Sequence, residues 1–495
     1  RQRLQLSEFE GSRAVLYDLA NGYRMEAMAE ANILDFALPA TNNLRELYLL
    51  IDEAAAPALR AIPVNLNLPE TNGADYLILT HSLLRADGDA VQAYADYRAS
   101  AQGGSYRTAV VNVDGLYDLF GYGVLQHPMA IRNFLAWQRR TNPNFAFLFI
   151  IGKGREYIDI RIPSRLAAAL GTTLFVPTFG FPGSDNLLVS GKDKPTPLVA
   201  TGRLAATTPA EVRTYLQKIQ DLETTVANAP QTIEGKGWMK QVLHLGGGAT
   251  AGERSSIRNH LERFAGNLET GRFGAEVTSF YKASSDPIEV SQTESIFGRI
   301  NEGVSLITFF GHSSAGNFDF SIDQPENYEN FGKYPLMLSL GCYSGNSFTA
   351  AKSIGEEFVF MERGAAAAYA ASRGLGFIHA LAAFGNTFSR YASDDLYGQP
   401  IGVLLQSSVR AHEDLTDIAY GSLIEQFSLQ GDPALRLNPA EGEDYLIDER
   451  TLVFEPRIID IQQDSFFVNF SLYNLGQKQT DSIDILVQQE LPEGS

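Results

Sequence analysis

The stretch that decides the fold is Leu336-Met337-Leu338-Ser339-Leu340-Gly341-Cys342-Tyr343-Ser344-Gly345-Asn346, an apolar run that ends at the only cysteine of the chain. An earlier apolar run, Val304-Ser305-Leu306-Ile307-Thr308-Phe309-Phe310, ends in the same way at Gly311-His312-Ser313-Ser314. Short apolar runs closed by glycine and small polar residues are typical of strands buried inside a parallel sheet. Functional groups of α/β proteins gather at the carboxyl ends of such strands. The sequence therefore predicts that a thiol and an imidazole meet at one edge of a sheet.

Strand and helix patterns alternate on both sides of these two runs. Apolar runs typical of strands cover residues 76–80, 108–113, 145–152, 198–203, 241–245, 275–281 and 364–371. Helical spacing covers residues 89–101, 128–139, 208–225, 251–266, 291–302, 354–363, 377–393 and 400–412. Two of these helices open with the residues of a capping box, at Thr208–Glu211 and at Ser291–Glu294. This alternation indicates an α/β fold with mostly parallel sheets covered by helices.

The two ends of the chain have a different pattern, which is typical of β-structure. Short apolar stretches and an Ala-Pro-rich piece at 54–63 predict a β-rich segment and a linker over residues 1–70. Alternation at 466–473 and 482–487 predicts the start of an Ig-like β-sandwich over residues 441–495. Between them we expect a first α/β sub-domain over 71–197 and a second over 198–440, which carries both functional residues. Both chain ends look like cuts from a longer or processed protein.

Charge and composition exclude several classes of function. The formal net charge is −19 with a pI ≈ 4.9, whereas nucleic-acid binding requires a basic surface. No apolar run approaches the roughly 18 residues of a membrane-spanning helix. A single cysteine cannot form an internal disulfide, and the other histidines lack the spacing of metal ligands. We interpret Gly246-Gly247-Gly248 as a turn, because no Gly-Lys-Ser/Thr follows it as in a phosphate-binding loop.

Cys342 and His312 together can carry out nucleophilic catalysis. A thiol is a good nucleophile only as thiolate, and an imidazole can take its proton and later protonate a leaving amine. Acyl transfer also needs N–H donors where negative charge develops. The backbone N–H groups of Ser313 and Cys342 are our candidates for this oxyanion hole. On pattern alone, a buried structural thiol and a satisfied histidine remain an equal alternative.

Several motifs resemble those of one known family. They are Gly311-His312-Ser313-Ser314, Leu340–Gly345, Gly202-Arg203-Leu204, Val176–Gly180 and Gly431-Asp432-Pro433-Ala434-Leu435. The family is that of the gingipain-type cysteine peptidases of the caspase-like clan, and the resemblance spans residues 72–438. Phe120-Gly121-Tyr122-Gly123, the stretch His127–Leu135 and the ending Gly431–Leu437 look most similar to one branch, the sortases or C-terminal signal peptidases of type IX secretion.

The resemblance implies a function as well as a caspase-like fold in two α/β sub-domains. His312 would be the general base and acid, and Cys342 the nucleophile. The substrate would be a polypeptide, in the sortase branch a secreted protein with a C-terminal sorting domain, and the acyl group could pass to an amine. Other secretion-system components are expected partners, nucleic acid is not, and the expected location is the bacterial outer-membrane surface or outside the cell. No cofactor is required. The wider family uses Ca²⁺ structurally, so loop carboxylates are candidate ligands, although we interpret the acid-rich stretches 319–329 and 441–449 as solvated loops.

The chain departs from the family pattern in ways that leave a rival hypothesis open. Ser313 stands where the family usually has glycine, and no acid precedes Gly202-Arg203 to orient the histidine. Asp185 or Asp193 could replace that acid, although a dyad without a third member is the simpler arrangement. The substrate-pocket wall is expected in the loop 372–377, at Arg373, Gly374 and Phe377. The rival is a pseudo-peptidase, a catalytically inactive fold that serves as a cell-surface binding or assembly module.

Overall fold

The computed structural model describes residues 2–8, 13–51, 64, 66–192, 194–413, 416–437, 440–459, 464–479, 482–486 and 488. The chain divides into two compact units, residues 1–64 and residues 65–495, and each is described by itself. The Ala-Pro-rich piece at 54–63, Asp193 and Val487 lie outside the described residues. The finer domain boundaries stay predictions.

The N-terminal unit is built from antiparallel strands. They are β1 (Gln2–Leu6), β2 (Arg13–Asp18), β3 (Tyr23–Met28), β4 (Leu34–Leu38) and β5 (Leu47–Ile51). β1 pairs with β4, and β2 lies between β3 and β5. Leu34, Phe36 and Leu38 are buried, whereas the residues between them are exposed, as expected for a strand with one face on a core. The predicted β-rich N-terminal segment is therefore confirmed.

Ten strands of the described residues form one large sheet in the second unit. In chain order they are β6 (Tyr76–Thr80), β7 (Thr108–Asn112), β8 (Phe147–Ile151), β11 (Ala200–Leu204), β12 (Gln241–Gly246), β13 (Glu276–Tyr281), β14 (Leu306–Phe310), β15 (Leu336–Leu340), β16 (Ala368–Ser372) and β17 (Phe427–Gln430). Their order across the sheet is β13-β12-β14-β15-β16-β17-β11-β8-β6-β7. The central strands are buried along their whole length, for example β14 and β15. Because both faces of these strands are buried, their sequences are continuous apolar runs. The predicted α/β class is confirmed.

The joint between the two halves of this sheet is the strand β17. It pairs antiparallel with β16 and parallel with β11, where Gln430 lies opposite Arg203. All other neighbours in the sheet are parallel. The sequence predicted separate sheets for two sub-domains. The strands of both instead belong to one sheet, because β17 supplies hydrogen bonds to an edge of each half.

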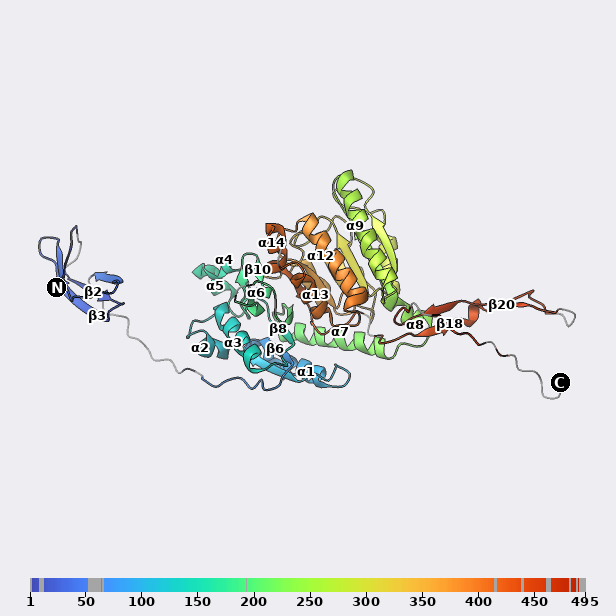
Figure 1. Cartoon of the computed structure of the whole chain (residues 1–495), viewed down its shortest axis with the longest axis horizontal. Coiled ribbons are helices and arrows are strands. Elements are labelled where there is room, and N and C mark those ends of the chain that lie inside the picture. Colours follow the sequence, from blue (N-terminus) through green and yellow to red (C-terminus); the bar gives the residue numbers. More distant parts are fainter. Residues whose placement is uncertain are drawn as a thin grey trace. The chain divides into compact units, whose positions relative to one another are not determined.

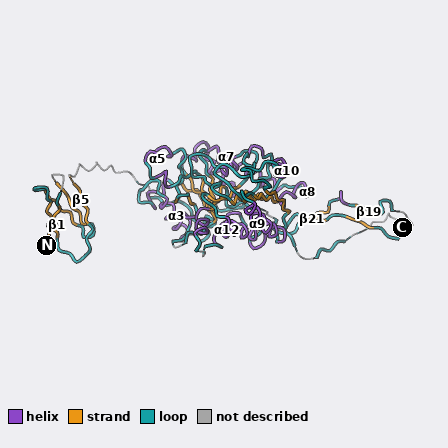
Figure 2. Tube along the Cα trace, turned by 90° about the horizontal axis from the view of Figure 1, so that it is seen from above, coloured by secondary structure: helices purple, strands orange, loops and turns teal. Residues whose placement is uncertain are grey.

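Helices cover both faces of the sheet. They are α1 (Ala86–Ala99), α2 (Asp114–Phe120), α3 (Pro128–Thr141), α4 (Tyr157–Ile160), α5 (Pro163–Ala169), α6 (Asn186–Val189), α7 (Pro209–Ala227), α8 (Ile233–Lys236), α9 (Ala251–Thr270), α10 (Thr293–Glu302), α11 (Ile354–Phe360), α12 (Ile378–Arg390), α13 (Ile401–Arg410) and α14 (Ile418–Gln426). α7 and α10 lie on one side of the strands, and α3, α9 and α12 on the other (Figure 2). In the view of Figure 1, α9 and α12 run side by side, and these two helices pack against each other.

The starts of two helices test the predicted capping boxes. Thr208 caps α7, and its hydroxyl accepts a hydrogen bond from the Glu211 N–H at 3.2 Å. The box predicted at Ser291 does not form, since the Ser291 hydroxyl donates to Glu289 instead. α10 starts after Gln292 with no side-chain cap.

The motif Gly431–Leu435, which directly follows β17, holds the end of this strand in place. Asp432 is fully buried, and its carboxylate accepts hydrogen bonds from the Tyr76 hydroxyl at 2.8 Å, from Arg98 Nε at 2.6 Å and from the Tyr94 hydroxyl. Its backbone N–H donates to the Tyr215 hydroxyl at 2.8 Å. The motif therefore ties β17 to β6, α1 and α7, and its role in this structure is architectural.

The C-terminal residues form an antiparallel ribbon. β18 (Tyr445–Ile447) pairs with β21 (Leu472–Asn474), and β19 (Val453–Glu455) pairs with β20 (Phe467–Asn469). The predicted strand at 482–487 is not seen in its described part, residues 482–486. That this region starts an Ig-like β-sandwich stays a prediction. Lys240 fastens the ribbon, because its buried ammonium donates to the Gly476 carbonyl. Burial lowers the pKa of Lys240 to about 8. In the described part of the chain, no helix is both long and apolar enough to span a membrane.

Candidate active site

His312 and Cys342 follow two neighbouring parallel strands. β14 and β15 pair in register with Phe310 opposite Leu340, so each functional residue stands two positions beyond this pair. Adjacent strands of a sheet lie about 4.8 Å apart, and both strands are held in place by their buried apolar side chains. The apolar runs thus deliver the imidazole and the thiol to the same edge of the sheet.

The two loops stay in contact beyond the strands. The Gly311 N–H donates to the Leu340 carbonyl at 3.3 Å, and the Ser313 hydroxyl donates to the Cys342 carbonyl at 2.9 Å. Gly341 makes this approach feasible, because a methyl group at that position would lie 2.1 Å from the Ser313 Oγ. Ser313 therefore joins the histidine loop to the cysteine loop.

The Cys342 sulfur is half-buried and has a backbone partner. The Gly376 N–H donates to Sγ at 3.3 Å, and the thiol faces the Gly376 carbonyl at 3.7 Å. The Tyr343 N–H donates to the Gly374 carbonyl at 2.8 Å, which holds the loop after β16 against the cysteine.

The two N–H groups predicted for the oxyanion hole are those of Ser313 and Cys342, and this role stays a prediction. Among the described residues, neither the Ser313 N–H nor the Cys342 N–H donates to a protein acceptor. The neighbours of Ser313 are paired, since the Ser314 N–H donates to Asn317 and the Asp319 N–H donates to the His312 carbonyl. These pairs form a tight hairpin that fixes the direction of the Ser313 N–H.

His312 has a carboxylate partner that the sequence analysis missed. Its Nε2 lies 3.3 Å from Glu253 Oε2, and the hydrogen bond to His312 lowers the pKa of Glu253 below its usual range. The same oxygen accepts the backbone N–H groups of Ala249 at 2.9 Å and Thr250 at 3.2 Å. Glu253 is thus held by the capping box at the start of α9, and it orients the imidazole from that position.

A sequence signal for Glu253 was present. Thr250-Ala251-Gly252-Glu253 has the spacing of a capping box and follows a strand through a glycine run. Nothing in that pattern indicated that the glutamate would also reach a histidine 59 residues later. With Nε2 engaged by Glu253, Nδ1 is the ring nitrogen left for the thiol. Within the described residues no hydrogen bond joins the ring to the sulfur.

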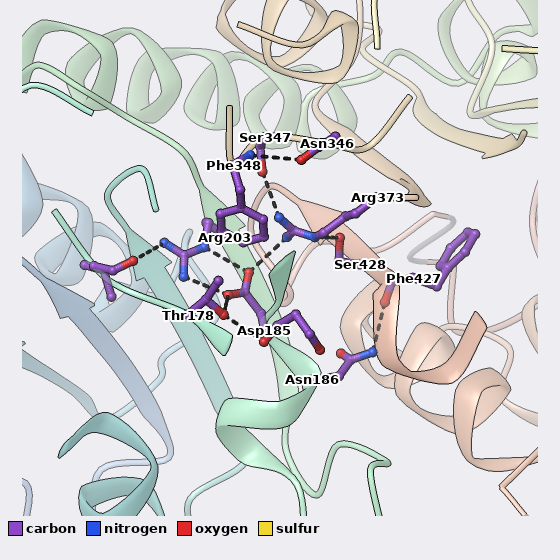
Figure 3. Close-up of polar contacts among 12 residues, drawn as sticks. Thr178, Asp185, Asn186, Arg203, Asn346, Ser347, Phe348, Arg373, Phe427 and Ser428 are labelled. Carbon is purple, nitrogen blue, oxygen red and sulfur yellow. Dashed lines mark hydrogen bonds and ion pairs between the residues drawn. The ribbon is translucent and has the colours of Figure 1, made fainter. Parts of the chain in front are cut away.

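Asp185 does not orient His312. One carboxylate oxygen accepts from Arg203 Nη2 at 2.7 Å and from the Thr178 hydroxyl at 3.0 Å. The other accepts from Arg203 Nε and from Arg373 Nη2, each at 2.9 Å. The Phe348 ring lies against both guanidinium groups, 5.1 Å from Arg203 and 3.9 Å from Arg373 (Figure 3). The expectation of an orienting role is therefore wrong, because the buried Asp185 carboxylate pairs with the guanidinium groups of Arg203 and Arg373.

The Arg373 side chain is likewise not a pocket wall. It is 1% exposed, and it donates to Ser347 at 2.9 Å and to Ser428 (Figure 3). Burial lowers the pKa of Arg373 to about 10. Ser347 follows the cysteine loop, so the buried pair of Asp185 and Arg373 holds the end of that loop in place. Gly374 and Phe377 lie in the loop beside the cysteine, and the Phe377 side chain is exposed; their contact with substrate stays a prediction.

The described residues contain no group of three or more His, Cys, Asp or Glu side chains that could hold a metal ion. The structural calcium implied by the resemblance stays a prediction, and no step of the chemistry below uses a metal.

The fold and this edge of the sheet define an α/β protein of the cysteine-peptidase type. The family model of peptidase family C25 matches residues 69–438. The chain belongs to peptidase family C25, the family of the gingipain cysteine peptidases.

Solved structures agree on the fold. The crystal structure of the Arg-specific cysteine proteinase gingipain R (RgpB) matches with a TM-score of 0.58 and 15% identity, over 77% of this chain and 83% of that chain. The complex of Porphyromonas gingivalis RgpB pro- and mature domains matches with a TM-score of 0.56 and 13% identity, over 75% and 82%. Dimeric latent PorU from Porphyromonas gingivalis matches with a TM-score of only 0.32 and 17% identity, over 52% and 28%, and supports no conclusion here. No curated protein sequence matches the chain.

Proposed function

We propose that this chain is an active cysteine endopeptidase in which Cys342 is the nucleophile and His312 the general base and acid. The observation that carries the proposal is the hydrogen bond between His312 Nε2 and Glu253 at the edge where the thiol also lies. A histidine oriented by a carboxylate and placed beside a thiol is the arrangement that nucleophilic catalysis needs. The capping box accounts for Glu253 at the start of α9, but it does not account for the contact of its carboxylate with the His312 ring.

The reaction follows from these positions. His312 Nδ1 takes the thiol proton, and the thiolate attacks the peptide carbonyl carbon, whose oxygen receives the negative charge. The N–H groups of Ser313 and Cys342 donate to this oxyanion. The intermediate collapses to a thioester as the imidazolium gives its proton to the leaving amine. Water, or another amine, then attacks the thioester with His312 again as base.

The finer proposal is that the enzyme is a type IX secretion sortase-like peptidase. The support is the sequence resemblance at Phe120–Gly123, His127–Leu135 and Gly431–Leu437. It would cleave C-terminal sorting domains from secreted proteins and could pass the acyl group to an amine, because a thioester reacts with amines as well as with water. We place it at the bacterial cell surface or outside the cell, with polypeptide substrates and secretion-system components as partners.

The rival function is an inactive binding or assembly module with the same fold. The departure that favours it, Ser313 in place of glycine, leaves the N–H in place and adds a bond to the cysteine loop. Incubating the purified chain with a model protein that bears a C-terminal sorting domain separates the two. Cleavage that Cys342→Ala abolishes supports the enzyme, and an added amine tests transfer. No cleavage, combined with iodoacetamide labelling of Cys342 that His312→Ala does not slow, would establish the module.

A further inference from the structure

A buried carboxylate lies beneath the His312 loop. Asp319 belongs to the acid-rich stretch that was predicted to be a solvated loop, yet its side chain is almost fully buried. That prediction is wrong at this residue, because hydrogen bonds to the His312 and Gly248 backbone hold Asp319 inside the protein. Asp319 closes the hairpin of the histidine loop, where its N–H donates to the His312 carbonyl at 3.0 Å.

The same residue holds the loop that carries Glu253. Asp319 Oδ2 accepts the Gly248 N–H at 2.8 Å. Gly248 directly precedes Ala249 and Thr250, the two residues whose N–H groups hold the Glu253 carboxylate. Asp319 thus connects the backbone that positions His312 to the backbone that positions Glu253, through one hydrogen bond on each side.

Two glycines make room for this carboxylate. A methyl group at position 247 would lie 2.2 Å from Asp319 Oδ1, and its nearest neighbours would all be atoms of Asp319. A methyl group at position 311 would lie 2.7 Å from the same oxygen. Such contacts are far inside van der Waals distance. Gly247, the middle residue of the run Gly246–Gly248 that the sequence indicated only as a turn, is therefore explained by the close approach of Asp319.

The position of Asp319 is costly for the fold. Burial raises the pKa of Asp319, opposed by the Gly248 amide, by Lys282 and by the His312 amide and ring. Its nearest cation, Lys282 Nζ, is 3.8 Å away, and Oδ1 has no hydrogen-bond partner among the described residues. A buried carboxylate with an unsatisfied oxygen lowers the stability of the fold, so its presence here calls for a role other than stabilisation.

We propose that Asp319 is a positioning residue that fixes the distance and angle between Glu253 and His312. It does not touch the thiol or the substrate in this role; it clamps the two loops whose side chains form the orienting hydrogen bond. This inference rests on the proposed function, because an oriented His312 matters only where it activates Cys342.

The test measures the rate at which iodoacetamide alkylates Cys342, together with kcat and KM for peptide cleavage. Asp319→Ala should slow alkylation and lower kcat by about tenfold with little change in KM, since small misplacements of catalytic groups can cost up to about a hundredfold. Asp319→Asn keeps an acceptor for the Gly248 N–H and should lose less. Glu326→Gln, an exposed acid in the same stretch, is the matched control and should leave both rates unchanged.

Two double variants separate positioning from simple loss of stability. In a Glu253→Gln background, Asp319→Ala should cause little further loss, because both act through the same hydrogen bond. Gly247→Ala should slow alkylation by displacing Asp319, and the Gly247→Ala/Asp319→Ala double variant should be no slower than Asp319→Ala alone. Losses that multiply in both pairs would overturn the proposal.

The controls also distinguish this inference from the proposed function. If His312→Ala leaves the alkylation rate unchanged, the proposed function itself fails. If His312→Ala slows alkylation but Asp319→Ala and Gly247→Ala do not, at a melting temperature close to that of the wild type, only the positioning role of Asp319 is refuted.

Discussion

Replacing Glu253 by glutamine separates the two tasks of this residue. Glutamine can still accept the backbone N–H groups of Ala249 and Thr250, since a capping box tolerates Gln as well as Glu. The negative charge that Glu253 places beside the His312 ring is lost. The variant should therefore fold with nearly unchanged stability and yet activate Cys342 less well.

The size of the effect follows from the exposure of the pair. A hydrogen bond to a charged group contributes about 1.5–3 kcal/mol. The His312 and Glu253 side chains are 55% and 32% exposed, which reduces the value towards the 0.2–1 kcal/mol or so of exposed ion pairs. We expect a loss near 1 kcal/mol in transition-state stabilisation, which is about a fivefold decrease in kcat/KM.

The assay is a pH profile of kcat/KM for peptide cleavage, with the alkylation rate of Cys342 measured beside it. The pKa of Glu253 lies below its usual value of 4.5, so its carboxylate is ionised throughout the neutral range. The wild type should exceed the variant at neutral pH, and the difference should vanish as the pH falls through the lowered pKa. Glu262→Gln, an exposed acid on the same helix, is the control.

Two results would refute this reasoning. Equal kcat/KM for the wild type and Glu253→Gln would show that the carboxylate does not orient His312 during catalysis. A fivefold loss accompanied by a matching fall in the free energy of unfolding would show that Glu253 acts only as a helix cap.

Three further predictions concern the support of the site and of the C-terminal ribbon. Gly341→Ala should slow alkylation of Cys342, because its methyl group would lie 2.1 Å from the Ser313 Oγ; adding Ser313→Gly should restore most of the rate, and no recovery would contradict the contact. Asp185→Asn leaves two buried guanidinium groups short of their counter-charge and should lower the free energy of unfolding in urea by about 3–5 kcal/mol, whereas Glu302→Gln in an exposed pair should change it by less than about 0.5 kcal/mol. Burial lowers the pKa of Lys240 to about 8 from its usual value of 10.5, so between these two pH values the unfolded chain binds more protons than the folded chain. The free energy of unfolding should therefore rise with pH in this range. Lys240→Met should flatten the plot of this free energy against pH, and parallel plots for the variant and the wild type would refute the contribution of Lys240.

The sequence predicted the fold well where local patterns carried the information. The runs at Leu306–Phe310 and Leu336–Leu340 are continuous because both faces of each strand are buried, and this pattern does not depend on distant contacts. Because the two strands are parallel neighbours, their carboxyl ends, and with them His312 and Cys342, could be predicted to meet at one edge of the sheet. The fusion of the two expected sheets could not be predicted, because β17 is short and its mixed pairing is decided by which edges it meets.

The supporting groups of the site were harder to predict than the thiol and the imidazole. Asp185 was the expected acid, yet Arg203 and Arg373 surround it. Glu253 was overlooked because its capping box explains it fully from local sequence. A side chain with two roles shows only the local one in the sequence, whereas its distant contact depends on how the loops meet at the sheet edge.

The place of β17 in the chain has a consequence for the order of folding. This strand is the last of the sheet to be synthesised, yet it lies between β16 and β11 near the middle. Before residues 427–430 are available, the edges of β11 and β16 are both unpaired, and exposed edges of this kind invite pairing with other chains. Closure of the sheet therefore waits for nearly the whole C25 region, residues 69–438. A nascent chain that lacks these residues would therefore carry two half-sheets, each with one open edge at the place where β17 later pairs.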